Sequence, residues 1–122
     1  MTAKPTEARA DDIALTERKC VPCEGGVQPL SRAEAQRYLK KLAPGWALSP
    51  DAARIERSWK FKDFYRTMSF VNAVAHVANS EDHHPDLELG YDYCRVRYMT
   101  HAIKGLSEND FICAAKIDRL TQ

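Results

Sequence analysis

The stretch FKDFYRTMSFVNAVAHVANSEDHHPDLELGYDYCRVRYMT, residues 61–100, decides the fold of this chain. Its first half carries apolar side chains at helical spacing behind Asp63, a residue type that caps helix N-termini. The helix must end by His83 or His84, because the residue before Pro85 is disfavoured in the helical region. Beyond Pro85 apolar and polar residues alternate, which predicts strands. Two strands are expected, at about 87–91 and 94–100, with a turn at Asp92-Tyr93.

The flanking segments complete the pattern. Ser31 and Glu34 form a capping box that opens a first helix, and Ser107 and Asp110 open a last helix in the same way. Two further strands are expected, at 46–48 and 54–61. The order α-β-β-α-β-β-α predicts an α+β fold, in which a four-stranded antiparallel sheet carries three helices on one face. The long helix should bury Phe64, Met68, Val71, Ala75 and Ala78, flanked by Phe70, Val74 and Val77.

Length and charge narrow the class of protein. The chain has 122 residues, which suits one domain. We expect a flexible tail over residues 1–19 and a single domain over 20–122. The net charge is +1, which argues against direct nucleic-acid binding by bulk electrostatics. The sequence has neither a membrane-spanning run nor the apolar centre of a secretion signal, so we expect a cytoplasmic protein without membrane contact.

The four cysteines are expected to be thiols. In a reducing compartment Cys20, Cys23, Cys94 and Cys113 would not be paired in disulfides. Cys20-x-x-Cys23 lacks the second pair that a zinc ribbon requires, and it does not open a helix as a thioredoxin motif would. An irregular turn is the favoured interpretation, with redox activity as a weaker alternative.

The histidines are the candidates for chemistry. His83 and His84 stand where the long helix ends, and their rings should diverge. The negative end of the helix favours a charged imidazole, hence an acid near neutral pH. His101 ends a strand, and Asp110 at a helix start could orient a histidine. Taken singly, these residues are better explained as solvated histidines and a helix cap. His76, inside the helix, carries little functional weight.

A metal site is a weaker hypothesis than proton transfer. A catalytic zinc requires three protein ligands and an open position. Two histidines one helical turn apart are absent, and adjacent histidines rarely bind one ion because their rings diverge. We therefore predict no metal and no cofactor.

Together these residues resemble the pterin-4a-carbinolamine dehydratase family. The matching signature is His83-His84-Pro85, then Tyr91, His101 and Asp110, separated by five, nine and eight residues. The neighbouring segments FKDF, DHHPDLELGY and THAIKGLSENDF also match, and KCVPCEGG at 19–26 is similar to an extension of many bacterial members. One position departs from the pattern. Asn79 stands where the family usually has Glu or another ionisable residue, four positions before the first histidine.

The resemblance implies a reaction and roles for the site residues. The activity would be dehydration of 4a-hydroxytetrahydropterin (4a-hydroxytetrahydrobiopterin) to quinonoid dihydropterin, without a metal. His83 and His101 would be the acid/base pair, and Asp110 would orient or polarise His101. His84 would mainly hold the pterin. The remaining contacts to substrate are expected from Asp82, Tyr91, Met99 and Thr100.

The resemblance also implies partners. The product would be recycled for aromatic amino-acid hydroxylases, and the chain would form a homodimer or homotetramer. Unpaired sheet edges offer a surface that a sister subunit could extend. Two alternatives stay open at this point. One is a non-enzymatic protein-binding module on the same fold, and the other is a role in a related pterin or molybdopterin pathway.

Overall fold

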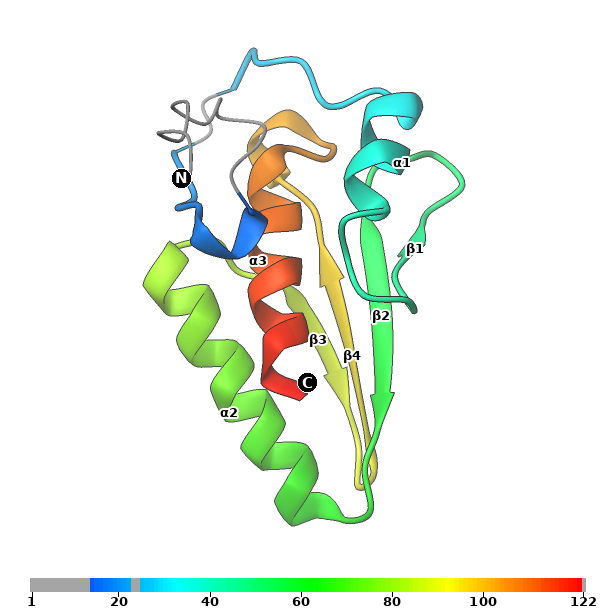
Figure 1. The fold of residues 1–122 in the computed structure, drawn as a ribbon, viewed down its shortest axis with the longest axis vertical. Coiled ribbons are helices and arrows are strands. Elements are labelled where there is room, and N and C mark those ends of the chain that lie inside the picture. The colour runs from blue at the N-terminus through cyan, green and yellow to red at the C-terminus, as the bar shows by residue number, and fades with distance from the viewer. Residues whose placement is uncertain (1–13, 23–24, 122) are drawn as a thin grey trace, which may run out of the picture.

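A computed structural model describes residues 14–22 and 25–121 (Figure 1). Its helices are α1, Arg32–Leu39, α2, Phe64–Glu81, and α3, Glu108–Asp118. Its strands are β1, Ala47–Leu48, β2, Ile55–Lys60, β3, Asp86–Leu89, and β4, Tyr93–Tyr98. Three short 3-10 helices complete it: η2, Leu15–Glu17, η3, His101–Ile103, and η4, Arg119–Thr121. The predicted order of helices and strands is confirmed.

The four strands form one antiparallel sheet in the order β1-β2-β4-β3. The two central strands pair along six residues, from Ile55 opposite Tyr98 to Lys60 opposite Tyr93. β3 pairs with β4 on one side only, so β3 is an edge strand. The predicted α+β class and four-stranded antiparallel sheet are therefore correct. In Figure 1, α2 and α3 run side by side along the length of the sheet.

Local signals fix the helix ends. Both predicted capping boxes are present, with Ser31 and Ser107 as the N-caps. Asp63 caps α2 by accepting a hydrogen bond from the Arg66 amide at 2.9 Å. α2 ends at Glu81 because Asp82 turns into the left-handed region, with φ of 50°. This turn releases the chain from the helix immediately before the two adjacent histidines.

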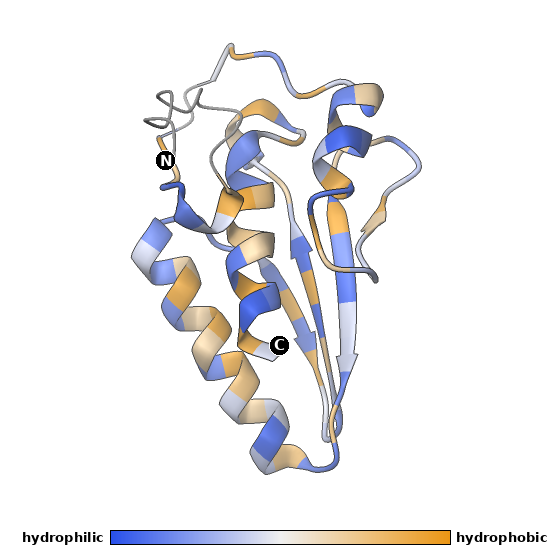
Figure 2. Cartoon of the chain, in the orientation of Figure 1, coloured by the Kyte–Doolittle hydropathy of each residue, from blue (hydrophilic) through white to orange (hydrophobic). Residues whose placement is uncertain are grey.

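The core lies between the helices and one face of the sheet (Figure 2). Alternate residues of β4 point into it, namely Cys94, Val96 and Tyr98, and all three are fully buried. α2 turns a different stripe to the core from the one predicted, because Phe64 and Ala75 are exposed. The buried residues of α2 are Thr67, Phe70, Val71, Val74 and Ala78. The residues expected to widen the stripe therefore lie near its centre.

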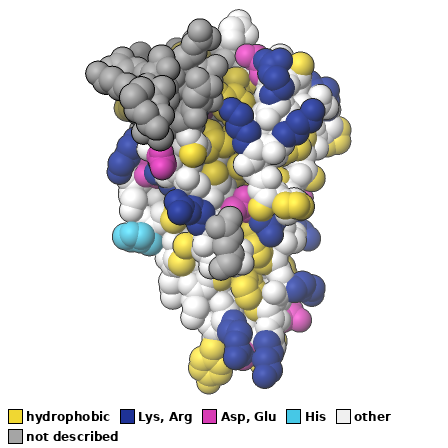
Figure 3. Space-filling view, viewed as in Figure 1, with side chains coloured by type: hydrophobic (Ala, Val, Ile, Leu, Met, Phe, Trp, Pro, Cys, Tyr) yellow, Lys and Arg dark blue, Asp and Glu magenta, His cyan; other side chains and the backbone are white. Residues whose placement is uncertain are grey.

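Charged side chains occupy the opposite face of the sheet. Arg95 contacts Glu88, and Arg97 contacts Glu56, each across neighbouring strands. Lys and Arg are dispersed over the face seen in Figure 3 and do not gather in one patch there. No helix in the described part of the chain is long and apolar enough to cross a membrane.

The predicted flexible tail does not extend to residue 19. The tail was predicted to run to residue 19, but Leu15 is 5% exposed and packs in the core. Arg18 is also buried and forms an ion pair with Glu108 at the start of α3. A lone leucine within a charged segment is too weak a pattern to reveal such packing. Residues 1–13 of the predicted tail, and Cys23, lie outside the described residues.

Candidate active site

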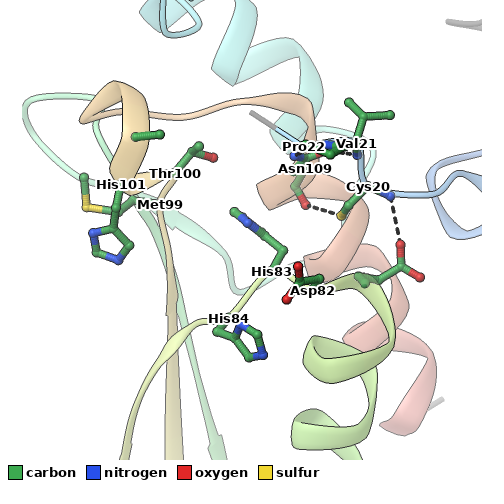
Figure 4. Close-up of a pocket in the computed structure, with 12 residues that line it drawn as sticks. Cys20, Val21, Pro22, Asp82, His83, His84, Met99, Thr100, His101 and Asn109 are labelled. Atoms are coloured by element: carbon green, nitrogen blue, oxygen red, sulfur yellow. Dashed lines mark hydrogen bonds between the residues drawn. The ribbon is translucent and has the colours of Figure 1, made fainter. Parts of the chain in front are cut away.

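A cavity of about 460 Å³ opens where three segments meet (Figure 4). The turn after α2 supplies Asp82, His83 and His84, and the end of β4 with η3 supplies Met99, Thr100 and His101. The third wall is the N-terminal segment Cys20–Pro22. The cavity therefore brings together three imidazoles that come from both sides of the β3–β4 hairpin.

His83 is held by a buried carboxylate. Its Nε2 lies 2.6 Å from Asp110 Oδ1, and the Asp110 side chain is fully buried. The other oxygen, Oδ2, accepts hydrogen bonds from the Thr100 hydroxyl and the Ser107 amide, each at 2.9 Å. On its flat face, the His83 ring stacks on Tyr98, with ring centroids 5.3 Å apart. The ring is fixed in position, and its Nδ1 is the nitrogen left for a ligand.

These surroundings favour the charged form of His83. Burial alone would lower the pKa of the imidazole, but the hydrogen bond and the negative charge of Asp110 outweigh it. Cys113 and Asp82 add smaller contributions in the same direction, and the net result is a raised pKa. The raised pKa widens the pH range over which the His83 imidazole carries its second proton.

His84 faces another partner. Its Nε2 lies 3.0 Å from Asn79 Oδ1, and the rings of His83 and His84 extend in opposite directions in Figure 4. The predicted divergence of the two rings is confirmed. An amide at position 79 accepts or donates a hydrogen bond without adding charge, so this site lacks the carboxylate that Glu would bring.

His101 lies across the cavity from this pair. It opens η3 at the end of β4 and is exposed. Within the described residues its ring has no hydrogen-bond or ion-pair partner. Asp110 was expected to orient His101, but the hydrogen bonds of its carboxylate in the described residues go to His83, Thr100 and Ser107. Sequence spacing could not predict these hydrogen bonds of Asp110, because they depend on which loop packs against the N-terminus of α3.

Tyr91 does not reach the cavity. It follows β3, roughly 20 Å along the strand from the adjacent histidines, at about 3.3 Å per residue. Its side chain is 65% exposed and its ring stacks on Phe64, 6.5 Å away. The geometry of this chain gives no support to the predicted substrate contact by Tyr91.

The family model for pterin 4 alpha carbinolamine dehydratase matches residues 28–120. This chain belongs to that family. A Nitrosomonas europaea protein provisionally named as a pterin-4-alpha-carbinolamine dehydratase is 62% identical over 106 residues, covering 87% of this chain and 92% of the relative. A Halorhodospira halophila protein with the same provisional name is 53% identical over 108 residues, covering 88% and 98%.

Solved structures agree with this assignment. The Brucella melitensis transcriptional coactivator/pterin dehydratase superposes with a TM-score of 0.73 at 32% identity, covering 78% of this chain and all of that one. A pterin dehydratase-like protein identified as a RuBisCO assembly factor in the alpha-carboxysome gives a TM-score of 0.55 at 21% identity, over 62% and 88%. The second likeness concerns the fold alone.

One wall of this dehydratase-family cavity was not predicted from the sequence. Asn109 is 5% exposed and its side-chain amide holds Val21, accepting from the Val21 amide at 3.1 Å and donating to its carbonyl at 2.6 Å. Glu81 accepts from the Cys20 amide at 2.8 Å. The only signal was the run KCVPCEGG, whose partners lie about 60 and 90 positions away.

No group of three or more His, Cys, Asp or Glu side chains is placed to hold a metal ion in the part of the chain that the structure describes. The three cavity histidines thus do not converge on one point. His83 instead directs Nε2 at a carboxylate, as an acid or base would.

Proposed function

We propose that this protein dehydrates 4a-hydroxytetrahydropterin (4a-hydroxytetrahydrobiopterin) to quinonoid dihydropterin and water. Membership of the family supports dehydratase chemistry in general. The observation that carries the finer proposal is His83, held by the buried Asp110, in one cavity with His84 and His101. This arrangement supplies a proton donor and a separate proton acceptor on opposite sides of a hollow.

His83 is the proposed general acid. The substrate carries a hydroxyl on carbon 4a beside N5–H, and hydroxide is a poor leaving group. Protonation by His83 lets the C4a–O bond break with its electron pair leaving on water. Asp110 does not touch the substrate; it is a positioning residue that keeps the imidazole charged until the proton is transferred.

His101 is the proposed general base. Its exposed ring accepts the proton of N5, and the N–H electron pair becomes the new C4a=N5 double bond. One proton is lost from nitrogen and one is gained by oxygen, so the pair of histidines returns to its initial state by exchange with solvent. Each such group typically contributes ~10²–10⁴-fold in rate.

The other cavity residues are proposed to hold the pterin. His84, oriented by Asn79, lies on the flank of the acid. Asp82, Met99 and Thr100 line the same hollow, where backbone groups at a strand end can bind the edges of a heterocycle. Thr100 is buried against Asp110, so its contact would come from the main chain.

The test is the dehydration of synthetic 4a-hydroxytetrahydropterin, followed by ultraviolet absorbance against the spontaneous rate. We expect the protein to accelerate this step, and His83→Gln and His101→Gln each to reduce kcat/KM at least ~100-fold. His76→Gln, on the exposed face of α2, is the matched control and should behave as wild type. If His83→Gln and His76→Gln react equally fast, the assignment of the acid fails. If no variant and no wild-type preparation exceeds the spontaneous rate, the catalytic proposal fails and a binding module is favoured.

The biological setting is also proposed. Recycling of the product for an aromatic amino-acid hydroxylase follows from the family resemblance. A cytoplasmic location is part of the proposal, and in such a reducing compartment Cys20, Cys94 and Cys113 would stay unpaired, as they are in the described residues. A homo-oligomer is supported by the unpaired edge of β3, where Leu87 and Leu89 are 38% and 37% exposed. Light scattering on the purified chain measures the last of these directly.

A further inference from the structure

Two cysteines far apart in the chain meet beside the cavity. Cys20 Sγ lies 3.6 Å from Cys113 Sγ, although 93 positions separate them. Cys113 is fully buried in α3, beneath the N-terminal segment. Cys20 is partly exposed and lines the cavity. One sulfur of the pair is thus reachable from the hollow, and the other lies directly behind it.

The surrounding contacts hold this pair in register. The Cys20 amide is bonded to Glu81, and the next residue, Val21, is bonded twice to Asn109. Glu81 in turn accepts a hydrogen bond from Lys116 at 2.8 Å, one helical turn beyond Cys113. Three side chains from α2 and α3 therefore fix the segment that carries Cys20. The position of Cys20 next to Cys113 is therefore fixed by hydrogen bonds to two helices.

The electrostatics favour one shared thiolate. The hydrogen-bond contact between the two sulfurs, in which either can donate, lowers the pKa of Cys113 despite its burial. Tyr98 and the charge of His83 act in the same direction. The pKa of Cys20 is raised by that same hydrogen bond, then by burial and by the negative charge on Cys113. The contact therefore favours the thiolate on Cys113 over that on Cys20, and the thiolate is the reactive form of a cysteine.

We propose that Cys20 and Cys113 are a modification site, a dithiol that a hydroperoxide oxidises to a disulfide. Cys20 Sγ attacks the peroxide oxygen while its proton passes to Cys113; the O–O bond breaks and hydroxide leaves. This gives a sulfenic acid on Cys20. Cys113 then loses its proton to hydroxide and attacks the Cys20 sulfur, and the S–O bond breaks. Counted from the fully protonated pair, two thiols and one hydrogen peroxide give one disulfide and two waters, with the sulfurs supplying the two electrons.

The bridge would fasten the cavity wall to α3. Bonded sulfurs lie at about 2.05 Å, so Cys20 would move toward the helix by roughly 1.5 Å from its present contact. The closed loop spans 93 positions, and long loops give the larger stabilisation on cross-linking. The oxidised chain should melt roughly 10 °C higher than the reduced one, and dithiothreitol should reverse the change.

The experiment is peroxide treatment of the full chain, followed by alkylation and mass spectrometry. We expect the intact mass to fall by two hydrogens and two thiols to escape alkylation. Trypsin should then release one cross-linked pair, residues 20–32 joined to 105–116. Because Cys20 and Cys23 share a tryptic peptide, Cys23→Ala decides which of them is bonded. The cross-link should persist in Cys23→Ala and Cys94→Ala and vanish in Cys20→Ser.

Three results would contradict a disulfide between Cys20 and Cys113. A Cys20–Cys23 bridge, loss of the cross-link in Cys23→Ala, or oxidation that stops at sulfinic acid would each overturn the proposal. Cys113→Ser should also abolish the cross-link; because that position is buried, its fold is checked by circular dichroism, and the Cys23→Ala map decides the matter if it fails to fold. None of these measurements uses pterin turnover, so they stand or fall apart from the proposed dehydratase activity.

Discussion

Replacement of Asp110 by Asn tests the link between the buried carboxylate and the charge of His83. The amide has nearly the same shape but no charge, and it must present either oxygen or nitrogen to each of its three partners. Hydrogen bonds to charged groups contribute about 1.5–3 kcal/mol each, and neutral ones about 1 kcal/mol. We expect Asp110→Asn to lower the free energy of unfolding by about 3 kcal/mol when His83 is charged, and by about 1 kcal/mol when it is neutral.

The pH dependence has a definite sign. The pKa of His83 is raised on folding above its ordinary 6.5, so the pair stabilises the fold fully below that value. This contribution is lost as pH rises through the folded pKa. Urea unfolding followed by tryptophan fluorescence should therefore show the larger cost near pH 6 and the smaller near pH 9, with kcat reduced ~100-fold near neutral pH.

Asp118→Asn is the matched control. Asp118 is a buried carboxylate in the same helix, paired with Arg57 at 2.6 Å. This pair contains no histidine, so the cost of this variant should be flat between about pH 6 and pH 9. If Asp110→Asn gives an equally flat cost, the charge of His83 is not tied to Asp110 and the proposed link is refuted.

Three further variants test other contacts. Tyr91→Ala should leave kcat/KM within about twofold of wild type in the carbinolamine assay, because its ring lies outside the cavity. Ser31→Ala should lower the free energy of unfolding in urea by about 1 kcal/mol through loss of the capping box with Glu34. Arg57→Ala should cost about 3–5 kcal/mol in the same assay, since it removes the cationic partner of the buried Asp118; a cost below that of Ser31→Ala would contradict this.

The helices and strands could be predicted because their signals are local. Ser31, Asp63 and Ser107 each cap a helix through a residue three positions away, and alternation along β4 follows from the pleat. The buried face of α2 was predicted less accurately, because Phe64 and Ala75 fit the helical period yet are exposed to solvent. Periodicity identifies a helix but fixes its rotation only loosely when apolar residues cover much of its surface.

Most features that could not be predicted from the sequence depend on contacts between residues far apart in the chain. Arg57 shares the inward face of β2 with Ile55 and Trp59, which conflicts with the alternating pattern. Its partner Asp118 lies 61 positions away, so the pattern alone could not explain it. The same holds for Asp110, whose choice of His83 over His101 is decided where η3 and α3 meet the turn after α2. Family spacing identified the three cavity histidines but left the partner of Asp110 open.

The carboxylate of Asp110 serves the helix start and the His83 imidazole at once, through separate oxygens. A lineage that abandoned the chemistry would still need Oδ2 at the Ser107 amide, so natural selection for folding would preserve this aspartate. The ring at position 101, which stabilises nothing among the described residues, would drift first. To separate enzymes from non-enzymatic proteins with this fold, the residue at position 101 should therefore be more informative than the residue at position 110.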